Sequence, residues 1–215
     1  MGNNQAKPDS FYTKLFARFY DPFVSGFEKK VLVYKRKEIL SDLTGDILEV
    51  GSGTGINFPL YHENANVIAS EPSNEMLNYA KTKLNEANVI ANIQLIQAGV
   101  GNKELESIIS PNGLDAIVCT LVLCTIPHPE EAIELFKKWL KPTGKLIILE
   151  HIHGNKQPRR MTHQLLNPVW KKFAEGCHLT RDTDVLLKEM GFKATYEYYF
   201  TKGLPFYQAV LVLES

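Results

Sequence analysis

The sequence predicts an α/β fold: a doubly wound, seven-stranded, mostly parallel sheet with an antiparallel last strand and helices on both faces. Between residues 46 and 150, short apolar runs alternate with segments of helical periodicity, as in parallel strands joined by right-handed crossovers. A glycine-rich stretch at 51–55 follows the first apolar run, where such folds bind ligands. Two final strand-like runs, 194–201 and 207–214, are joined by a short Gly-Leu-Pro loop, which predicts an antiparallel pair.

Capping residues and periodicity define the elements between these landmarks. Ser73 is the expected N-cap of a helix with apolar residues at helical spacing, and Pro129 followed by two glutamates begins another helix. Thr180 is the expected cap of a late helix that ends at Gly191. We expect strands at 46–50, 66–70, 92–97, 114–119, 145–150, 194–201 and 207–214, and helices near 55–62, 73–87, 103–109, 129–140 and 180–191.

Two segments flank or interrupt this alternation. Residues 1–10 are expected to be a disordered tail and residues 11–215 a single domain, because no linker divides them. Residues 11–37 carry aromatic side chains at helical spacing, broken by an Asp-Pro pair. They predict helices that either pack on the core or cover a ligand as a lid. Residues 152–178 predict a helical insertion that either roofs a substrate pocket or packs plainly on the domain.

The composition excludes several classes of function. Lys plus Arg and Asp plus Glu both number 24, so no net positive charge favours nucleic acid as a partner. Cys119, Cys124 and Cys177 form neither a disulfide framework nor a paired zinc motif, so we expect a reducing, cytoplasmic location and no metal. No apolar run reaches the roughly 20 residues of a membrane span, and the polar N-terminus is not a signal peptide. We expect a soluble monomer.

The glycine-rich stretch predicts a nucleotide-like ligand. Glycines at 51, 53 and 55 allow tight turns and close approach of the backbone to a ligand. Glu71 follows the next apolar run, where a carboxylate can accept hydrogen bonds from two ribose hydroxyls. A dinucleotide loop would need its third glycine at position 56, which is Ile56, and no Gly-Lys-Ser/Thr marks a phosphate-binding loop. The stretch therefore fits neither the dinucleotide-binding loop nor the phosphate-binding loop.

The order Glu-x-Gly-x-Gly-x-Gly, from Glu49 to Gly55, resembles motif I of the class I S-adenosylmethionine (SAM) methyltransferases. This resemblance implies a Rossmann-like methyltransferase fold, with SAM as cofactor and S-adenosylhomocysteine (SAH) as product. It implies that the glycine loop passes the amino-acid part of SAM and that residues 98–100 flank the adenine. A Tyr-Asp-Pro sequence is similar to the lid helix of ubiquinone- and phospholipid-type methyltransferases, which adds Tyr20. The expected cofactor-binding residues are Tyr20, Glu49, Gly51, Ser52, Gly53, Gly55, Asn57, Phe58, Glu71, Pro72, Met76, Gly99, Val100, Thr120, Leu121 and Cys124.

Four later segments resemble the microsomal alkyl-thiol methyltransferases, also known as the methyltransferase-like seven proteins. These segments are Val118–Cys124, Glu150-His151, Leu166–Trp170 and Gly176–Arg181, and the resemblance covers about residues 45–190. It implies that a thiol is the favoured acceptor, and the Met, Leu and Trp side chains within residues 152–178 favour a small apolar molecule. The chain departs from those proteins by lacking their N-terminal hydrophobic segment and by carrying Glu71 where they have Asp.

His151 is the expected catalytic base, because it ends the fifth strand at the ligand edge and histidine titrates near neutral pH. The alternatives are that His151 is structural and that the sulfonium charge suffices to stabilise a thiolate. We interpret Cys124 as a wall of the pocket and Arg181 as structural. Two other functions stay open: a phospholipid or quinone methyltransferase in weak peripheral contact with a membrane, and a non-catalytic SAM-binding protein.

Overall fold

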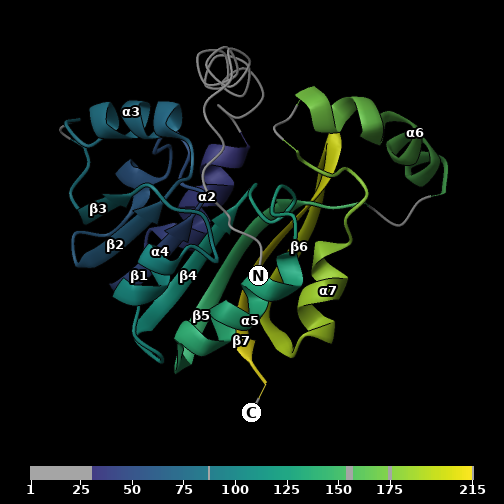
Figure 1. Ribbon diagram of the computed structural model, residues 1–215. Helices are drawn as coiled ribbons and strands as arrows, with labels where there is room; N and C mark the ends of the chain where they lie inside the picture. The colour runs from purple at the N-terminus through teal and green to yellow at the C-terminus, as the bar shows by residue number, and fades with distance from the viewer. Residues whose placement is uncertain (1–30, 87, 154–156, 174–175, 215) are drawn as a thin grey trace.

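The chain folds around one seven-stranded sheet with the order β3-β2-β1-β4-β5-β7-β6 (Figure 1). The computed structural model describes residues 31–86, 88–153, 157–173 and 176–214, so the expected tail, most of the expected lid and Tyr20 lie outside the described residues. Only β7 runs antiparallel to its neighbours, between β5 and β6, which confirms the predicted doubly wound α/β sheet. The strands are β1 (Gly45–Val50), β2 (Ala65–Ser70), β3 (Asn92–Ile96), β4 (Leu114–Thr120), β5 (Leu140–His151), β6 (Phe192–Lys202) and β7 (Leu204–Leu213).

Helices cover both faces of the sheet, and each face has its own apolar core. Neighbouring residues of β1 point to opposite sides, so Ile47 and Leu48 are both fully buried but belong to different cores. One core includes α2 (Leu32–Leu40), the short η1 (Phe58–Leu60) and α3 (Asn74–Lys83), and the other includes α4 (Lys103–Ile108), α5 (Pro129–Trp139) and α7 (Thr183–Glu189). Helix α6 (Gln157–Phe173) lies apart from both layers (Figure 1). Within the described residues, no helix combines the length and apolar character that a membrane span requires.

Local signals explain most helix boundaries. The Ser73 hydroxyl accepts a hydrogen bond from the Met76 N–H, as predicted for an N-cap, and Pro129 occupies the first turn of α5. The helix expected at 55–62 shrinks to η1, because the chain before it is shaped by left-handed glycines. The prediction that Thr180 caps α7 is wrong, since Asp182 is the N-cap residue and the preceding Arg181 carbonyl accepts a hydrogen bond from His153 N–H.

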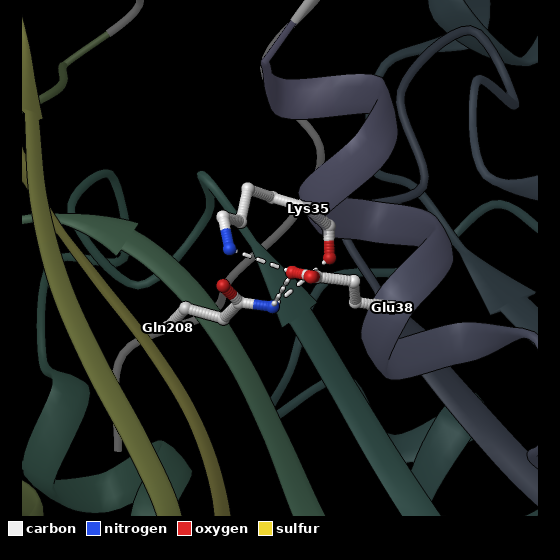
Figure 2. Close-up of polar contacts among 3 residues, drawn as sticks. All are labelled: Lys35, Glu38 and Gln208. Carbon is white, nitrogen blue, oxygen red and sulfur yellow. Dashed lines mark hydrogen bonds and ion pairs between the residues drawn. The ribbon is translucent and has the colours of Figure 1, made fainter.

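Helix α2 is anchored to β7 by a buried glutamine (Figure 2). The Gln208 side-chain amide donates to the Lys35 carbonyl at 3.1 Å and to the Glu38 carboxylate at 3.4 Å. Glu38 also pairs with the Lys35 ammonium at 2.7 Å, and that ammonium lies 4.3 Å from the ring centroid of Tyr198. These contacts fix the helix against the sheet and thereby bring Arg36 to the edge where the candidate site lies.

Candidate cofactor and acceptor site

The glycine loop after β1 is shaped by three left-handed residues. Gly51, Gly53 and Gly55 have φ angles of +63°, +57° and +79°, a region that side chains disfavour. A methyl group at Gly51 would clash with Val122, and one at Gly55 would clash with the ring of Phe58. A methyl group at Gly53 would meet nothing within 4 Å. The loop therefore packs against the next strand's end on one side and leaves its middle open to a ligand.

Glu71 lies at the end of β2 and faces this loop. Its carboxylate accepts hydrogen bonds from the backbone N–H groups of Gly53 at 3.0 Å and Ser73 at 2.9 Å. These two bonds orient the carboxylate toward the loop, and a carboxylate is the kind of acceptor that ribose hydroxyls donate to. Among the described residues, the buried Ser52 hydroxyl has no hydrogen-bond partner. An oriented carboxylate and an unsatisfied hydroxyl beside an open glycine fit the ribose and amino-acid parts of SAM.

Four other expected cofactor-binding residues are Pro72, Met76, Gly99 and Val100. A methyl group at Gly99 would lie 3.9 Å from Pro72 Cβ, so the segment after β2 and the expected adenine-flanking segment are neighbours. Met76 is buried, and Val100 is half-buried against the core. Their contacts with SAM stay predictions.

A buried polar network supports the loop from below. Arg36 donates to Asn57 Oδ1 at 2.9 Å and to the Thr120 hydroxyl at 2.6 Å. The Asn57 amide donates to Glu49 at 2.7 Å, and the Tyr61 hydroxyl donates to the other oxygen of Glu49 at 3.0 Å. We call these five residues the oxygen–nitrogen network.

Glu49 is the titratable centre of this network. Burial raises the pKa of Glu49 to about 7, against the opposing effect of the hydrogen bonds from Asn57 and Tyr61. Burial also raises the pKa of Tyr61 well above its ordinary value. Glu49, Asn57, Thr120 and the neighbouring Phe58, all predicted cofactor residues, are each less than a tenth exposed. In this structure the three polar side chains bond within the network, and their contact with SAM stays a prediction.

The turn after β4 is strained at Leu121, whose φ angle is +58°. A left-handed conformation costs a non-glycine residue on the order of 1–3 kcal/mol and concentrates at functional sites. The Glu150 carboxylate at the end of β5 holds the turn by accepting the N–H groups of Val122 at 2.7 Å and Leu123 at 2.9 Å. Burial raises the pKa of Glu150, and these two backbone bonds oppose that rise.

Arg181 clamps the same turn from the other side. Its guanidinium donates to the carbonyls of Leu123 and Ile126, the latter at 2.8 Å. The His178 N–H donates to the Cys124 carbonyl at 3.0 Å. The structural interpretation of Arg181 is therefore supported by its contacts, which explain how three of the thiol-methyltransferase-like segments meet at one turn.

Beside this turn lie Cys124, His151 and Cys177, which we call the sulfur–imidazole cluster. All three are buried, and one ligand atom from each lies within 4.8 Å of the other two. The His151 Nε2 atom lies 2.6 Å from Cys177 Sγ, and the Trp170 indole N–H of α6 donates to the same sulfur at 3.4 Å. Among the described residues, His151 Nδ1 has no hydrogen-bond partner.

The cluster shifts the protonation of its members. The pKa of Cys177 is lowered to about 4, chiefly by its hydrogen bond with Cys124 and also by its hydrogen bond with His151. The pKa of Cys124 is raised well above its ordinary value by the same bond to Cys177 and by burial. Burial alone would lower the pKa of His151, but its bond to Cys177 raises it. Cys124, expected to line the cofactor site, is thus placed in this cluster, and the catalytic role of His151 stays a prediction.

Sequence reasoning missed Arg36, Tyr61 and the pairing of Cys177 with His151, and it placed Trp170 in the insertion over the acceptor pocket without its contact to Cys177. No pattern in the neighbouring sequence marks Arg36 or Tyr61 as buried, because only the packing of the fold buries them. Trp170 and Cys177 stand within segments that carry the thiol-methyltransferase resemblance, and that shared membership was the available signal.

A hollow of about 340 Å³ lies elsewhere, near the amino ends of β1, β2 and β3. Asp46, Asn66 and Gln94 contribute to its lining. Ligands of doubly wound sheets bind outside the carboxyl ends of the strands. We therefore assign no cofactor to that hollow.

Known proteins with similar sequences include several methyltransferases. Residues 48–148 match the family model of a methyltransferase domain. Thiol S-methyltransferase TMT1B of Rattus norvegicus is 32% identical over 164 residues, covering 72% of this chain and 66% of that protein. TMT1B of Mus musculus is 31% identical over 177 residues, covering 80% and 70%. The ubiquinone/menaquinone biosynthesis C-methyltransferase UbiE of Vibrio cholerae is 27% identical, covering 74% and 68%.

Solved structures share the fold. A SAM-dependent methyltransferase from Aquifex aeolicus superposes with a TM-score of 0.65 at 17% identity, covering 93% of this chain and 98% of that one. A DhpI complex with SAH gives a TM-score of 0.63 at 16% identity, with coverages of 100% and 99%. With the relatives above, these findings show a SAM-dependent methyltransferase. The chain belongs to the class I SAM-dependent methyltransferases, in the family that includes the thiol S-methyltransferases TMT1A and TMT1B.

Proposed function

We propose that this enzyme transfers the methyl group of SAM to the thiol of a small apolar molecule. The observation that carries the proposal is the meeting of Cys124, His151 and Cys177 beside the turn whose Val122 packs against Gly51 of the cofactor loop. The segments that bring them together resemble the alkyl-thiol methyltransferases, and the TMT1B relatives are named thiol S-methyltransferases.

Methyl transfer from SAM depends mainly on how the acceptor sulfur and the methyl group are aligned. SAM supplies a methyl group on a cationic sulfonium, whose departure as a neutral thioether needs no acid. The protein must hold the acceptor sulfur in line with that methyl group and exclude water. The turn at Leu121–Leu123 would do this, because Glu150 and Arg181 fix it and Val122 packs against Gly51 of the cofactor loop.

The acceptor thiol must also lose its proton, since the thiolate is the nucleophile. We propose His151 for this step, because its Nδ1 atom is unpartnered among the described residues. Three free cysteines favour a reducing compartment, and we propose a cytoplasmic location.

A second function has one observation in its favour. Met161, Leu165, Leu166 and Val169 of α6 are each more than half exposed, with Leu165 exposed by 79%. The apolar part of a membrane lipid or quinone could cover such side chains, as the alternative of a phospholipid or quinone methyltransferase requires. The UbiE relatives and a phosphatidylethanolamine N-methyltransferase of Cereibacter sphaeroides, 29% identical over 53% of this chain, belong to such classes.

The two functions separate in one assay of SAH formation. The purified protein is given SAM with an alkyl thiol, the alcohol and amine of the same carbon skeleton, a quinone, or phosphatidylethanolamine vesicles. We expect turnover with the thiol alone, and none with Glu71→Ala, which removes the proposed ribose contact. Turnover on the lipid or quinone without turnover on thiols would overturn the thiol proposal. If calorimetry showed SAM binding but no acceptor gave SAH, the protein would be a non-catalytic SAM-binding protein.

A further inference from the structure

The sulfur–imidazole cluster has the composition of a metal site. Its two cysteines and one histidine come from three separate segments: the turn after β4, the end of β5 and the loop after α6. Two sulfurs and an imidazole form a soft donor set, which suits Zn²⁺ or Cu⁺ and not Mg²⁺ or Ca²⁺. The adjacent Glu150 uses one carboxylate oxygen to hold the backbone of the turn.

The spacing of the ligand atoms also suits one ion. Zinc bonds of about 2.0–2.3 Å place the ligand atoms of a tetrahedral site roughly 3.5 Å apart. The three atoms here lie within 4.8 Å of one another. His151 Nε2 and Cys177 Sγ, at 2.6 Å, would separate by about 1 Å on binding. The other two pairs, at no more than 4.8 Å, would need to approach by at most about 1 Å.

The surroundings hold the cluster in place. The Trp170 N–H points at Cys177 Sγ, as donors to metal-bound thiolates do. The backbone of Cys124 is fixed through the His178 N–H, and the flanking turn is clamped by Arg181. A ligand set that is buried and fixed by outer contacts is preorganised for an ion.

We propose that Cys124, His151 and Cys177 bind one zinc ion, with a fourth position left for the acceptor. Three protein ligands and one open position are typical of catalytic zinc, whereas structural zinc has four protein ligands. The two cysteine thiols release their protons to solvent as they bind the ion. Val122, two residues before Cys124, packs against Gly51, so the site adjoins the cofactor loop.

The role of the fourth position rests on the proposed thiol methylation. An acceptor thiol would bind the ion and release its proton to solvent. An electron pair of the bound sulfur would then form the new carbon–sulfur bond as the methyl–sulfonium bond breaks, giving the methyl thioether and SAH. The neutral thioether is a weaker ligand than the thiolate and leaves the ion. His151 would act as a ligand in this sequence, which replaces its proposed role as base.

Zinc binding is tested on the whole protein without any acceptor. Chelator-stripped protein is titrated with zinc alone, against a competing chelator, and with cobalt, whose thiolate complexes absorb in the near ultraviolet. We expect one ion per chain and a thiolate-to-cobalt band. Cys124→Ser and Cys177→Ser should weaken zinc binding at least about tenfold, because even outer-shell changes cost that much. Cys119→Ser, a buried cysteine outside the cluster, should bind as the wild type does.

A second measurement covers variants that fail to fold. In the wild type, zinc should slow alkylation of Cys124 and Cys177 but leave that of Cys119 unchanged, as read by peptide mass spectrometry. No zinc binding by the wild type, or equal binding by the cluster variants, would overturn the site. Zinc bound at the cluster without turnover on any thiol would leave the metal site standing and remove the thiol function. Thiol turnover by metal-free, chelator-treated enzyme at the full rate would remove the fourth-position role.

Discussion

The cofactor half and the acceptor half of the site are built in opposite ways. Under the cofactor loop, the oxygen–nitrogen network joins Arg36, Glu49, Asn57, Tyr61 and Thr120 through hydrogen bonds of 2.6–3.0 Å. Beside the turn at Leu121–Leu123, which we call the acceptor turn, the sulfur–imidazole cluster holds two thiols and an imidazole, whose Nδ1 atom has no hydrogen-bond partner among the described residues. The side chains under the cofactor loop are therefore fixed by bonds to one another, whereas those beside the acceptor turn include groups that can still bind a ligand.

Of the substitutions considered, removing Arg36 from the oxygen–nitrogen network should lower the free energy of unfolding the most. Arg36→Met removes the guanidinium that donates to Asn57 Oδ1 and takes its positive charge away from Glu49. Breaking a buried charged network typically costs about 4 kcal/mol, so we expect a loss of that size in the free energy of unfolding. Urea denaturation at neutral pH measures it. Lys83→Ala, which breaks a surface ion pair with Glu86, is the control and should cost less than about 1 kcal/mol. Equal losses in the two variants would contradict a supporting role for the network.

The protonation of Glu49 should make the scaffold sensitive to pH. Its pKa is raised from 4.5 to about 7 in the fold, so the folded protein keeps a proton that the unfolded chain releases. The resulting stabilisation is full below pH 4.5 and is lost as the pH rises through about 7. This rise in the pKa of Glu49 corresponds to about 3 kcal/mol at most.

The comparison variant is Glu49→Gln, which cannot titrate. Over this pH window, the free energy of unfolding of the wild type should fall by up to about 3 kcal/mol more than that of the variant. Denaturation curves at a series of pH values give the difference, in which other titrating groups cancel. Parallel curves for the two proteins would show that Glu49 keeps its ordinary pKa.

Removing the Glu150 carboxylate that holds the acceptor turn should have the smallest of these effects on the free energy of unfolding. Its effect on kcat should be clearer. Glu150→Ala leaves the N–H groups of Val122 and Leu123 without their acceptor, at a cost of about 2 kcal/mol. The strained turn should then relax, and kcat should fall at least about tenfold while the KM for SAM changes little. Glu150→Gln keeps an oxygen for both N–H groups and should restore most of kcat. If the Gln variant were as slow as the Ala variant, the carboxylate charge and not the turn would be what matters.

Much of the fold could be predicted from sequence because its signals are local. Ser73 and Pro129 mark helix starts within a few residues, and the glycine loop lies directly after its strand. Thr180 shows the limit of such signals: a residue suited to capping loses to a tertiary contact, the His153 N–H bound to the Arg181 carbonyl.

The site could be predicted only where its residues are close in sequence. Tyr61 lies 12 residues from Glu49, yet it was missed because nothing local marks it as buried. Arg36 stands between Lys35 and Lys37, and only packing decides which of the three cations is buried. His151 and Cys177 lie 26 residues apart, so their contact depends on how α6 and the loop after it return to the sheet.

The position of β7 has a consequence for how the enzyme is made. Residues 204–213 are the last strand in sequence, but they lie inside the sheet, between β5 and β6. Until they leave the ribosome, β5 is an edge strand whose apolar run from Leu146 to Leu149 has an unpaired backbone, a template for association with other chains. Glu150 and His151 are carried at the end of that strand. The groups proposed to position and activate the acceptor therefore lie on a strand that gains its second neighbour only once β7 has been made, whereas the strands around the cofactor loop can pair earlier.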